Sequence, residues 1–236
     1  MAEHIVRSYD NDLQGLRQRI AEMGGIAEKM LGDASQALVR HDKPLAQTVI
    51  AADSRLDVLQ REVEESAILT IARRQPLAVD LRETISAIRI SGDVERIGDL
   101  AKNIAKRALA IGDDFKPQKI VVSLKHMNDL VLEQLKDVLD AYAQQDTAKS
   151  LDVWKRDGAI DALYTSIFRE LLTYMMEDPR NISFCTHLLF CAKNIERIGD
   201  HTTNIAETVH YLVTGETLAI DRPKNDRSID AAVTGG

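Results

Sequence analysis

Two copies of one acidic pattern contain the residues of this sequence best suited to chemistry. The segment Asp93–Ala105 contains Glu-Arg-Ile-Gly-Asp, followed four residues later by Asn and then by Ile-Ala, and Asn194–Ala206 repeats that order. The acidic and amide residues at this spacing are Glu95, Asp99 and Asn103 in the first copy and Glu196, Asp200 and Asn204 in the second. Residues four apart lie on one face of an α-helix, and hard cations prefer oxygen ligands. The pattern therefore predicts two sites for divalent or ferric ions, with Fe, Mn, Mg and Zn all compatible.

A second acidic pair precedes each copy. These pairs are Asp53 with Asp57 and Asp157 with Asp161. Because proline cannot continue a helix, the chain is expected to fold back at Pro76. That turn places Asp57 level with Glu95, and one helical turn away it places Asp53 level with Asp99. The second half gives the same level pairs about its own proline turn: Asp161 with Glu196, and Asp157 with Asp200. Each half is therefore expected to gather four carboxylates at one height.

Carboxylates held this close repel one another, so each group needs compensation. A bound cation is one solution, and the metal prediction rests on it. Arg96 and Arg197, beside the acidic residues of each copy, offer another, in which the acidic face is solvated and paired by salt bridges. The acidic residues of Asp93–Ala105 are expected to point nearly opposite an apolar seam on the same helix.

No other grouping of residues suggests catalysis. The sequence has no glycine-rich phosphate loop and no Ser/His/Asp grouping. Glu207 and His210 form a single Glu-x-x-His, whereas a di-iron bundle needs two. Cys185 and Cys191 are expected to be free thiols, and His187, four residues before Cys191, is expected to be a core or surface residue. A non-enzymatic role is therefore predicted, with a metal-dependent enzyme or metal store on the same carboxylates as the alternative.

Composition favours long helices. The chain has 236 residues, of which 44% are hydrophobic and only 4% aromatic, a usage typical of helical proteins. A net charge of −7 argues against binding of nucleic acid, which needs a basic surface. The sequence shows no signal peptide and no apolar run of about 20 residues, the length that spans a membrane. A cytoplasmic protein is expected.

Capping residues and prolines divide the chain into six helices of about 30 residues. Asp42 and Asp146 are expected N-caps, and proline turns follow the second and fifth helices. The fold class is therefore all-α, a tandem repeat of two antiparallel three-helix bundles. The expected units are residues 1–112, residues 117–220 and a disordered tail at 221–236.

Glycines interrupt the helical pattern at two kinds of position. Gly24 and Gly25 are expected to weaken the first helix. Gly98 and Gly199 lie inside the repeated motif, where a mid-helix glycine costs about 1 kcal/mol relative to alanine. Tight helix packing is the expected reason, and close approach of a ligand is the alternative.

Together these features resemble the PhoU family. The resemblance covers about residues 5–215 and rests on two repeats of three long helices, each with acidic pairs and Glu-Arg-Ile-Gly-Asp followed by Asn. The stretch 72–76, Ala-Arg-Arg-Gln-Pro, with Asp-Leu-Arg at 80–82, is similar to the family's turn between the second and third helices. Leu100 and Lys102 differ from the equivalent His201 and Thr203, so equal metal loading of the two copies is not implied.

The resemblance implies a cytoplasmic regulator that is recruited to the inner face of the membrane through its partners. It implies negative regulation of the phosphate-starvation response and of phosphate uptake. The implied partners are the ATP-binding subunit of the phosphate ABC transporter and a membrane sensor histidine kinase, and the implied assembly is a homodimer. Some family members bind multinuclear metal clusters on the acidic motifs, which matches the ten residues named above.

Overall fold

A computed structural model describes residues 2–111 and 118–218 of the chain. Within them the chain forms six long α-helices, one short 3₁₀ helix (η1) and no strand. Their bounds are α1 Ala2–Arg40, α2 Lys43–Arg74, α3 Val79–Ala110, α4 Gln118–Gln144, α5 Thr147–Glu177, η1 Pro179–Asn181 and α6 Ile182–Thr214. The all-α prediction is confirmed, and the linker 112–117 and the predicted tail 221–236 lie outside the described residues.

The expected caps and turns set the helix boundaries. Asp42 begins α2 by accepting a hydrogen bond from the backbone N–H of Leu45 at 2.9 Å. Asp146 begins α5 in the same way, with two backbone N–H groups donating to its Oδ1. Helix α2 ends before Gln75 and Pro76, where Gln75 takes a left-handed conformation with φ 50°. Side-chain caps and proline thus fix where each hairpin turns.

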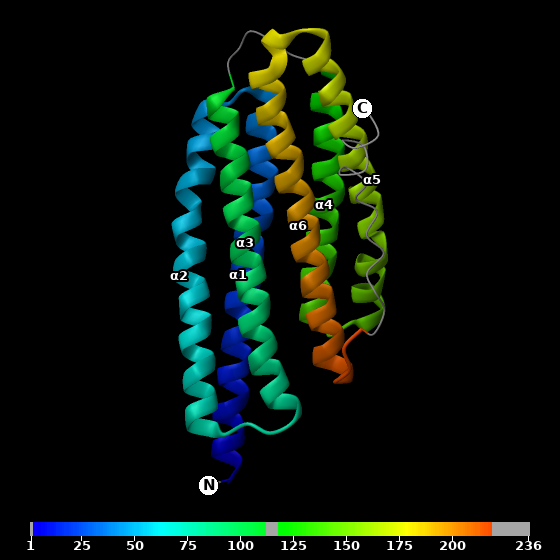
Figure 1. Cartoon of the computed structure of the whole chain (residues 1–236). Coiled ribbons are helices and arrows are strands. Elements are labelled where there is room, and N and C mark those ends of the chain that lie inside the picture. The colour runs from blue at the N-terminus through cyan, green and yellow to red at the C-terminus, as the bar shows by residue number, and fades with distance from the viewer. Residues whose placement is uncertain (1, 112–117, 219–236) are drawn as a thin grey trace.

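Two antiparallel three-helix bundles, α1–α3 and α4–α6, stand side by side (Figure 1). Helices α3 and α6 run antiparallel along the middle of the molecule, and α1 also contacts α4. The α2–α3 turn lies at one end of the molecule, and the α5–α6 turn lies at the opposite end. The predicted tandem architecture is confirmed, and the two copies of the acidic motif meet at the central helix pair.

The apolar seam of α3 forms the centre of the first bundle. Seven residues at spacings of three and four are fully or nearly buried: Ile90, Val94, Ile97, Ala101, Ile104, Ala108 and Ile111. Such a stripe along one side is the pattern expected of a core-facing helix. Within the described residues, none of the helices combines the length and apolar character needed to cross a membrane.

The expected interruption at Gly24 and Gly25 does not occur, because α1 continues through both glycines. Gly24 faces α4, and a Cβ at this position would lie 2.7 Å from a methyl group of Leu139. The missing side chain therefore lets α1 of the first bundle approach α4 of the second. Gly25 is exposed with no neighbour within 4 Å of such a Cβ.

The motif glycines serve close helix packing, as expected. A Cβ at Gly98 would clash with Leu56 of α2, and a Cβ at Gly199 would lie 3.2 Å from Ile160 of α5. Both glycines are buried. In each half they bring together the two helices that carry the acidic pairs.

Substituting Gly98 with alanine should therefore lower stability, by about 1–3 kcal/mol as for other overpacked sites. Gly92 lies on the same helix, but no atom lies within 4 Å of a Cβ built there. Gly92→Ala should instead stabilise the protein by up to about 1 kcal/mol, because alanine favours the helix. Urea unfolding followed by circular dichroism measures both changes. Equal effects of the two substitutions would contradict the packing role of Gly98.

Candidate functional site

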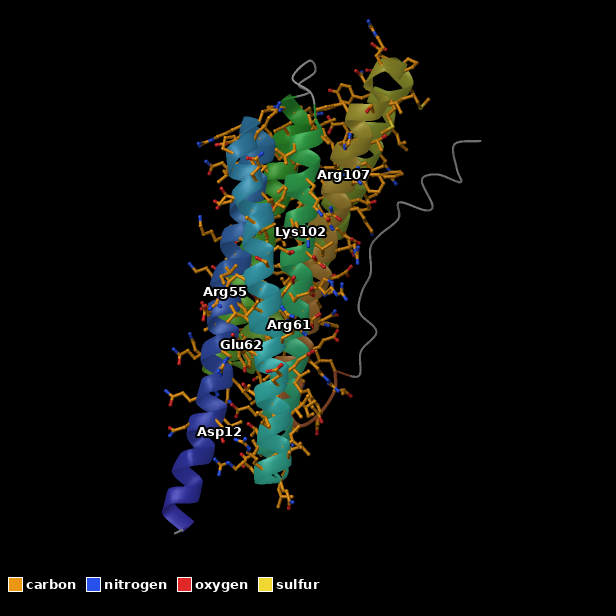
Figure 2. The ribbon with its side chains drawn as sticks, turned by 90° about the vertical axis from the view of Figure 1, so that its left-hand side faces the viewer. Asp12, Arg55, Arg61, Glu62, Lys102 and Arg107 are labelled. Carbon is orange, nitrogen blue, oxygen red and sulfur yellow. The ribbon has the colours of Figure 1, made fainter. Side chains whose placement is uncertain are left out.

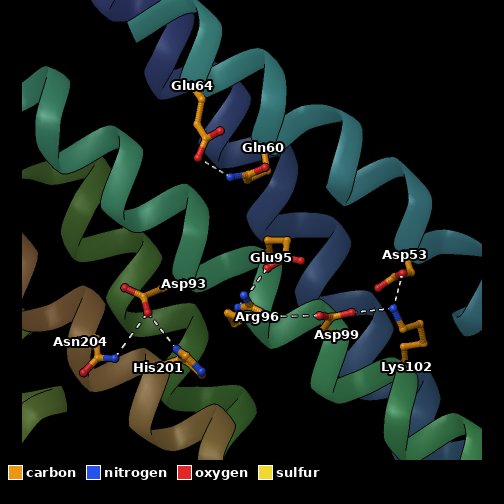
Figure 3. Close-up of polar contacts among 10 residues, drawn as sticks. All are labelled: Asp53, Gln60, Glu64, Asp93, Glu95, Arg96, Asp99, Lys102, His201 and Asn204. Atoms are coloured by element: carbon orange, nitrogen blue, oxygen red, sulfur yellow. Dashed lines mark hydrogen bonds and ion pairs between the residues drawn. The ribbon is translucent and has the colours of Figure 1, made fainter. Parts of the chain in front are cut away.

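The structure brings the first acidic group together at one level between α2 and α3. The ammonium of Lys102 lies 2.5 Å from Oδ2 of Asp53 and 2.5 Å from Oδ1 of Asp99, so it joins the two helices (Figure 3). Burial, together with the charges of Asp99, Asp57 and Asp53, raises the pKa of Glu95, although Arg96 opposes the shift. The predicted level pairing of these carboxylates is therefore confirmed in the first half.

Lys102 supplies most of the compensation in this group. Burial disfavours its charged form, but hydrogen bonds to Asp53 and Asp99 outweigh that effect and raise the pKa of Lys102. Arg96, which is exposed, lies 3.6 Å from both Glu95 and Asp99. Arg96 therefore adds compensating charge at the edge of the group, as the salt-bridge alternative expects. Lys102 provides the compensating charge at its centre.

The second acidic group forms between α5 and α6 with different compensation. Thr203 stands where the first copy has a lysine, and its hydroxyl lies 3.2 Å from Oδ1 of Asp157 as a donor. Burial is the main factor that raises the pKa of Glu196; Lys193 opposes it, and the charges of Asp200 and Asp161 add to it. Glu196 thus lies near Asp161 and Asp200, and Thr203 contacts Asp157 where the first half has Lys102 contacting Asp53.

Glu196 of the second group has one paired and one unpaired carboxylate oxygen. Its side chain is 6% exposed, and Lys193 donates to its Oε1 at 2.8 Å. Its Oε2 is buried and has no hydrogen-bond partner among the described residues. A buried, unpaired carboxylate oxygen is costly. The second group therefore has a free oxygen that a cation would satisfy.

The acidic residues of the two hairpins differ in burial. Asp53, Asp157, Asp161 and Glu196 are each 4–8% exposed. Glu95 and Asp99, which the sequence places opposite the apolar seam of α3, are 22% and 30% exposed. The neighbouring helix of each hairpin covers part of the acidic face, an effect that the pattern of a single helix does not include. The carboxylates thus lie at the edge of the core rather than on a solvated face.

The two motif asparagines lie away from the carboxylate groups. The amide of Asn204 lies 3.4 Å from Oδ1 of Asp93 on α3, and Nδ1 of His201 lies 2.8 Å from the same oxygen (Figure 3). Asn103 is exposed and lines a cavity between α3 and α6. Both asparagines therefore belong to the interface between the bundles.

The residues present fit a metal ion better in the second group than in the first. In the first group, a cation would have to displace the ammonium of Lys102 from two carboxylates. In the second, the unpaired Oε2 of Glu196, with Asp161 and Asp200 nearby, provides an oxygen ligand of the kind that hard cations prefer. Within the described residues no three His, Cys, Asp or Glu side chains converge as a ready-made metal site, so binding would need rotamer changes.

Sequence reasoning missed three contributors to these groups. Lys102 follows Asp99 by three residues and Lys193 precedes Glu196 by three, a spacing that signals a helical ion pair. The contact between Asp93 and His201 joins residues of different repeats, so only the packing of the bundles reveals it. Cys185 and Cys191 are buried free thiols, as expected.

Comparison with known proteins gives consistent matches along the chain. A family profile described as "PhoU domain" matches residues 20–108 and 124–209. A "Phosphate-specific transport system accessory protein PhoU homolog" of Rhizobium meliloti (strain 1021) is 56% identical over 223 residues, 94% of each chain. The protein of the same description from Caulobacter vibrioides (strain NA1000 / CB15N) is 53% identical, over 96% of this chain and 98% of its own.

Two crystal structures share the fold. That of PhoU from Pseudomonas aeruginosa superposes with a TM-score of 0.85 at 39% identity, over 88% of this chain and all of that chain. That of the phosphate transport system regulatory protein PhoU from Streptococcus pneumoniae gives a TM-score of 0.83 at 29% identity, over 90% of this chain and all of its own.

The raised pKa of Glu196 predicts how its charge affects stability. A carboxyl whose pKa is raised by folding destabilises the folded state above that pKa, and the penalty disappears as the pH falls. Glu196→Gln should therefore raise the melting temperature of metal-free protein by a few degrees at pH 7, and the gain should shrink toward pH 4.5, the ordinary value for glutamic acid.

Thermal melts between pH 4.5 and 8 in the presence of a chelator measure this effect. Glu133→Gln is the matched control, since that side chain is 64% exposed and should change the melting temperature little. A lower melting temperature for Glu196→Gln at pH 7 would show that its contact with Lys193 outweighs the cost of burial.

Proposed function

This chain belongs to the PhoU family, and we propose that it is an accessory protein of phosphate transport. The observation that carries this proposal is the 56% identity, over 94% of both chains, to a relative described as an accessory protein of the phosphate-specific transport system. The shared fold with a phosphate transport system regulatory protein supports a regulatory role. These relatives are named as accessory and regulatory proteins, which favours action through protein contacts over catalysis.

In its specific form, the proposal is that the chain restrains the phosphate-starvation response and phosphate uptake. It would do so by linking the ATP-binding subunit of the phosphate ABC transporter to a membrane sensor histidine kinase. The protein would act as a homodimer in the cytoplasm and reach the inner face of the membrane through these partners.

Exposed apolar side chains at both hairpin turns support an adaptor with two partners. Leu77 and Val79, at the α2–α3 turn, are 81% and 55% exposed. Met176 and Ile182, beside the α5–α6 turn, are 84% and 48% exposed. Exposed apolar groups of this kind mark contact surfaces, and the two turns lie at opposite ends of the molecule (Figure 1). We assign the α2–α3 turn to the ATP-binding subunit of the transporter.

We also propose that the carboxylate groups bind metal, with the second group binding more tightly. The support is the burial of the acidic residues and the unpaired Oε2 of Glu196. Bound metal would neutralise the charge between α5 and α6 and so stabilise that hairpin.

The adaptor proposal predicts that Leu77→Asp with Val79→Asp weakens binding to the ATP-binding subunit of the phosphate transporter about tenfold or more, because charge at an apolar contact costs affinity. Capture of that subunit from detergent-solubilised native membranes, followed by titration with the purified subunit, measures the change. The matched control is Val122→Asp, a substitution on α4 at a side chain that is 66% exposed.

Failure of the unsubstituted protein to capture either the transporter subunit or the kinase would contradict the adaptor role. Equal loss in Leu77→Asp/Val79→Asp and in Val122→Asp would contradict the assignment of the α2–α3 turn. Circular dichroism of each variant confirms that the helices remain folded.

The metal proposal predicts that Mn²⁺ raises the melting temperature of metal-free protein. Stabilisation should reach about 2.7 kcal/mol once the metal exceeds its dissociation constant about 100-fold. Asp157→Asn with Glu196→Gln should remove most of this shift, and Asp53→Asn with Asp99→Asn should remove less, because Lys102 already compensates the first group. No shift with Mn²⁺, Fe³⁺, Mg²⁺ or Zn²⁺ would contradict metal binding at both groups.

A further inference from the structure

A basic cavity lies between α3 and α6, apart from both carboxylate groups. It is open to solvent, has a volume of about 430 Å³ and is lined by Asn103, Lys106, Arg107, Ala110, His187, Phe190 and Asn194. This volume falls within the range of about 300–1,000 Å³ usual for small-molecule pockets. Its charged side chains are all basic, which is unusual for a chain of net charge −7. Arg107 lies above Lys102, toward one end of the molecule (Figure 2).

The two helix stretches that face each other here carry no acidic residue. Residues 100–110 of α3 and 182–195 of α6 contain no Asp or Glu. Neither Lys106 nor Arg107 forms an ion pair with a carboxylate of the described residues. The guanidinium of Arg107 lies 4.3 Å from the centroid of the Phe190 ring, and its Nη1 lies 3.4 Å from Nδ1 of His187. Positive charge is therefore concentrated in the cavity without an internal counter-ion.

The pKa of His187 is consistent with this accumulation of charge. Burial and the nearby guanidinium of Arg107 lower it, so the two basic groups disfavour each other's charge. An anion beside both groups would relieve that conflict.

At the equivalent place in the other repeat, the chain itself provides an anion, the carboxylate of Asp93. Asp93 occupies the position in the first copy that Asn194 occupies in the second, and Asn204 is the counterpart of Asn103. Around Asp93, His201 and Asn204 approach one carboxylate oxygen, at 2.8 and 3.4 Å. In the cavity the carboxylate is replaced by an amide.

The residues around the cavity differ in charge from their counterparts. Lys106 and Arg107 correspond to Glu207 and Thr208 of the second copy. One side of the α3–α6 interface thus has its own carboxylate, and the other has cations around an open space. Because no carboxylate of these two helix stretches balances the cations, the ligand expected in the cavity is an anion.

We propose that this cavity binds a phosphoryl oxyanion. Arg107 would present its planar fork of N–H donors to the oxygens, Lys106 would add a mobile positive charge, and the amides of Asn103 and Asn194 would donate further hydrogen bonds. The volume leaves room for the organic part of a phosphate ester beside the exposed ring of Phe190. This site goes beyond the proposed adaptor role and does not depend on it.

Isothermal titration of the full-length protein with inorganic phosphate, in a phosphate-free buffer of low ionic strength, tests the proposal. A parallel titration with ATP distinguishes free phosphate from a nucleotide as the source of the phosphoryl group. Arg107→Gln with Lys106→Gln should weaken binding at least about tenfold, since hydrogen bonds to charged groups are lost. Asn194→Asp should also abolish binding, because it restores the internal carboxylate found at Asp93.

Arg89→Gln is the matched control. Arg89 also lies on α3 over an aromatic ring of α6, with its guanidinium 5.7 Å from the centroid of Tyr211, but it does not line the cavity. The control should bind phosphate as the unsubstituted protein does. Weakening by Arg89→Gln equal to that by Arg107→Gln with Lys106→Gln would show a general charge effect and would overturn the site.

A variant of the linker between α3 and α4 tests whether the chain's own carboxylates compete for the cavity. Asp113 and Asp114 follow α3 in the sequence and lie outside the described residues. Binding that appears only in Asp113→Asn/Asp114→Asn would show that the chain's own carboxylates occupy the cavity, and would overturn the proposal. Absence of binding by both phosphate and ATP at about 10 mM, a concentration that would reveal even millimolar affinity, would also overturn it. Partner capture is measured separately, so failure here leaves the adaptor proposal intact.

Discussion

Negative charge placed between packed helices constrains both halves of this protein. Each hairpin brings four carboxylates to one height, and in each half some of these lie almost fully buried. A buried charge is tolerated only when a partner or a shift in pKa compensates it. The first half uses the ammonium of Lys102 between Asp53 and Asp99. The second half has Thr203 at the position of Lys102, and Lys193 pairs with Glu196. Burial raises the pKa of Glu196 there, as it raises that of Glu95 in the first half.

Duplication explains why the same constraint appears twice, and divergence explains why its solutions differ. The backbone requirements are shared: a proline turn, a helix cap and a motif glycine that allows two helices to approach. The compensating side chains are not shared, since Lys102 corresponds to Thr203 and Asp93 to Asn194. One ancestral pattern has therefore produced two carboxylate groups with differently placed lysines and an asymmetric interface between the bundles.

Features set by residues close together in the sequence could be predicted, and features set by contacts between the two bundles could not. The helices, their caps and the level pairing of Asp53 with Asp99 depend on spacing along the chain and on one turn, so the sequence predicts them. The contact between Asp93 and His201 depends on how one bundle packs on the other, and no local pattern contains that information. The continuity of α1 through Gly24 was missed for the same reason, because Leu139 of the other bundle occupies the space that the glycine leaves.

Helix α3 connects the features on which the proposals rest. One face carries Glu95 and Asp99, another packs against α6, and its end carries Lys106 and Arg107. A cation bound by the first carboxylate group would displace the ammonium of Lys102, which lies one helical turn before Lys106. The released charge would add to the positive potential around the cavity and favour an oxyanion there. Because coupling between two binding sites is reciprocal, an oxyanion in the cavity would equally favour a cation at Asp53 and Asp99. If both sites bind their ligands, the side chain of Lys102 is therefore the physical link between them.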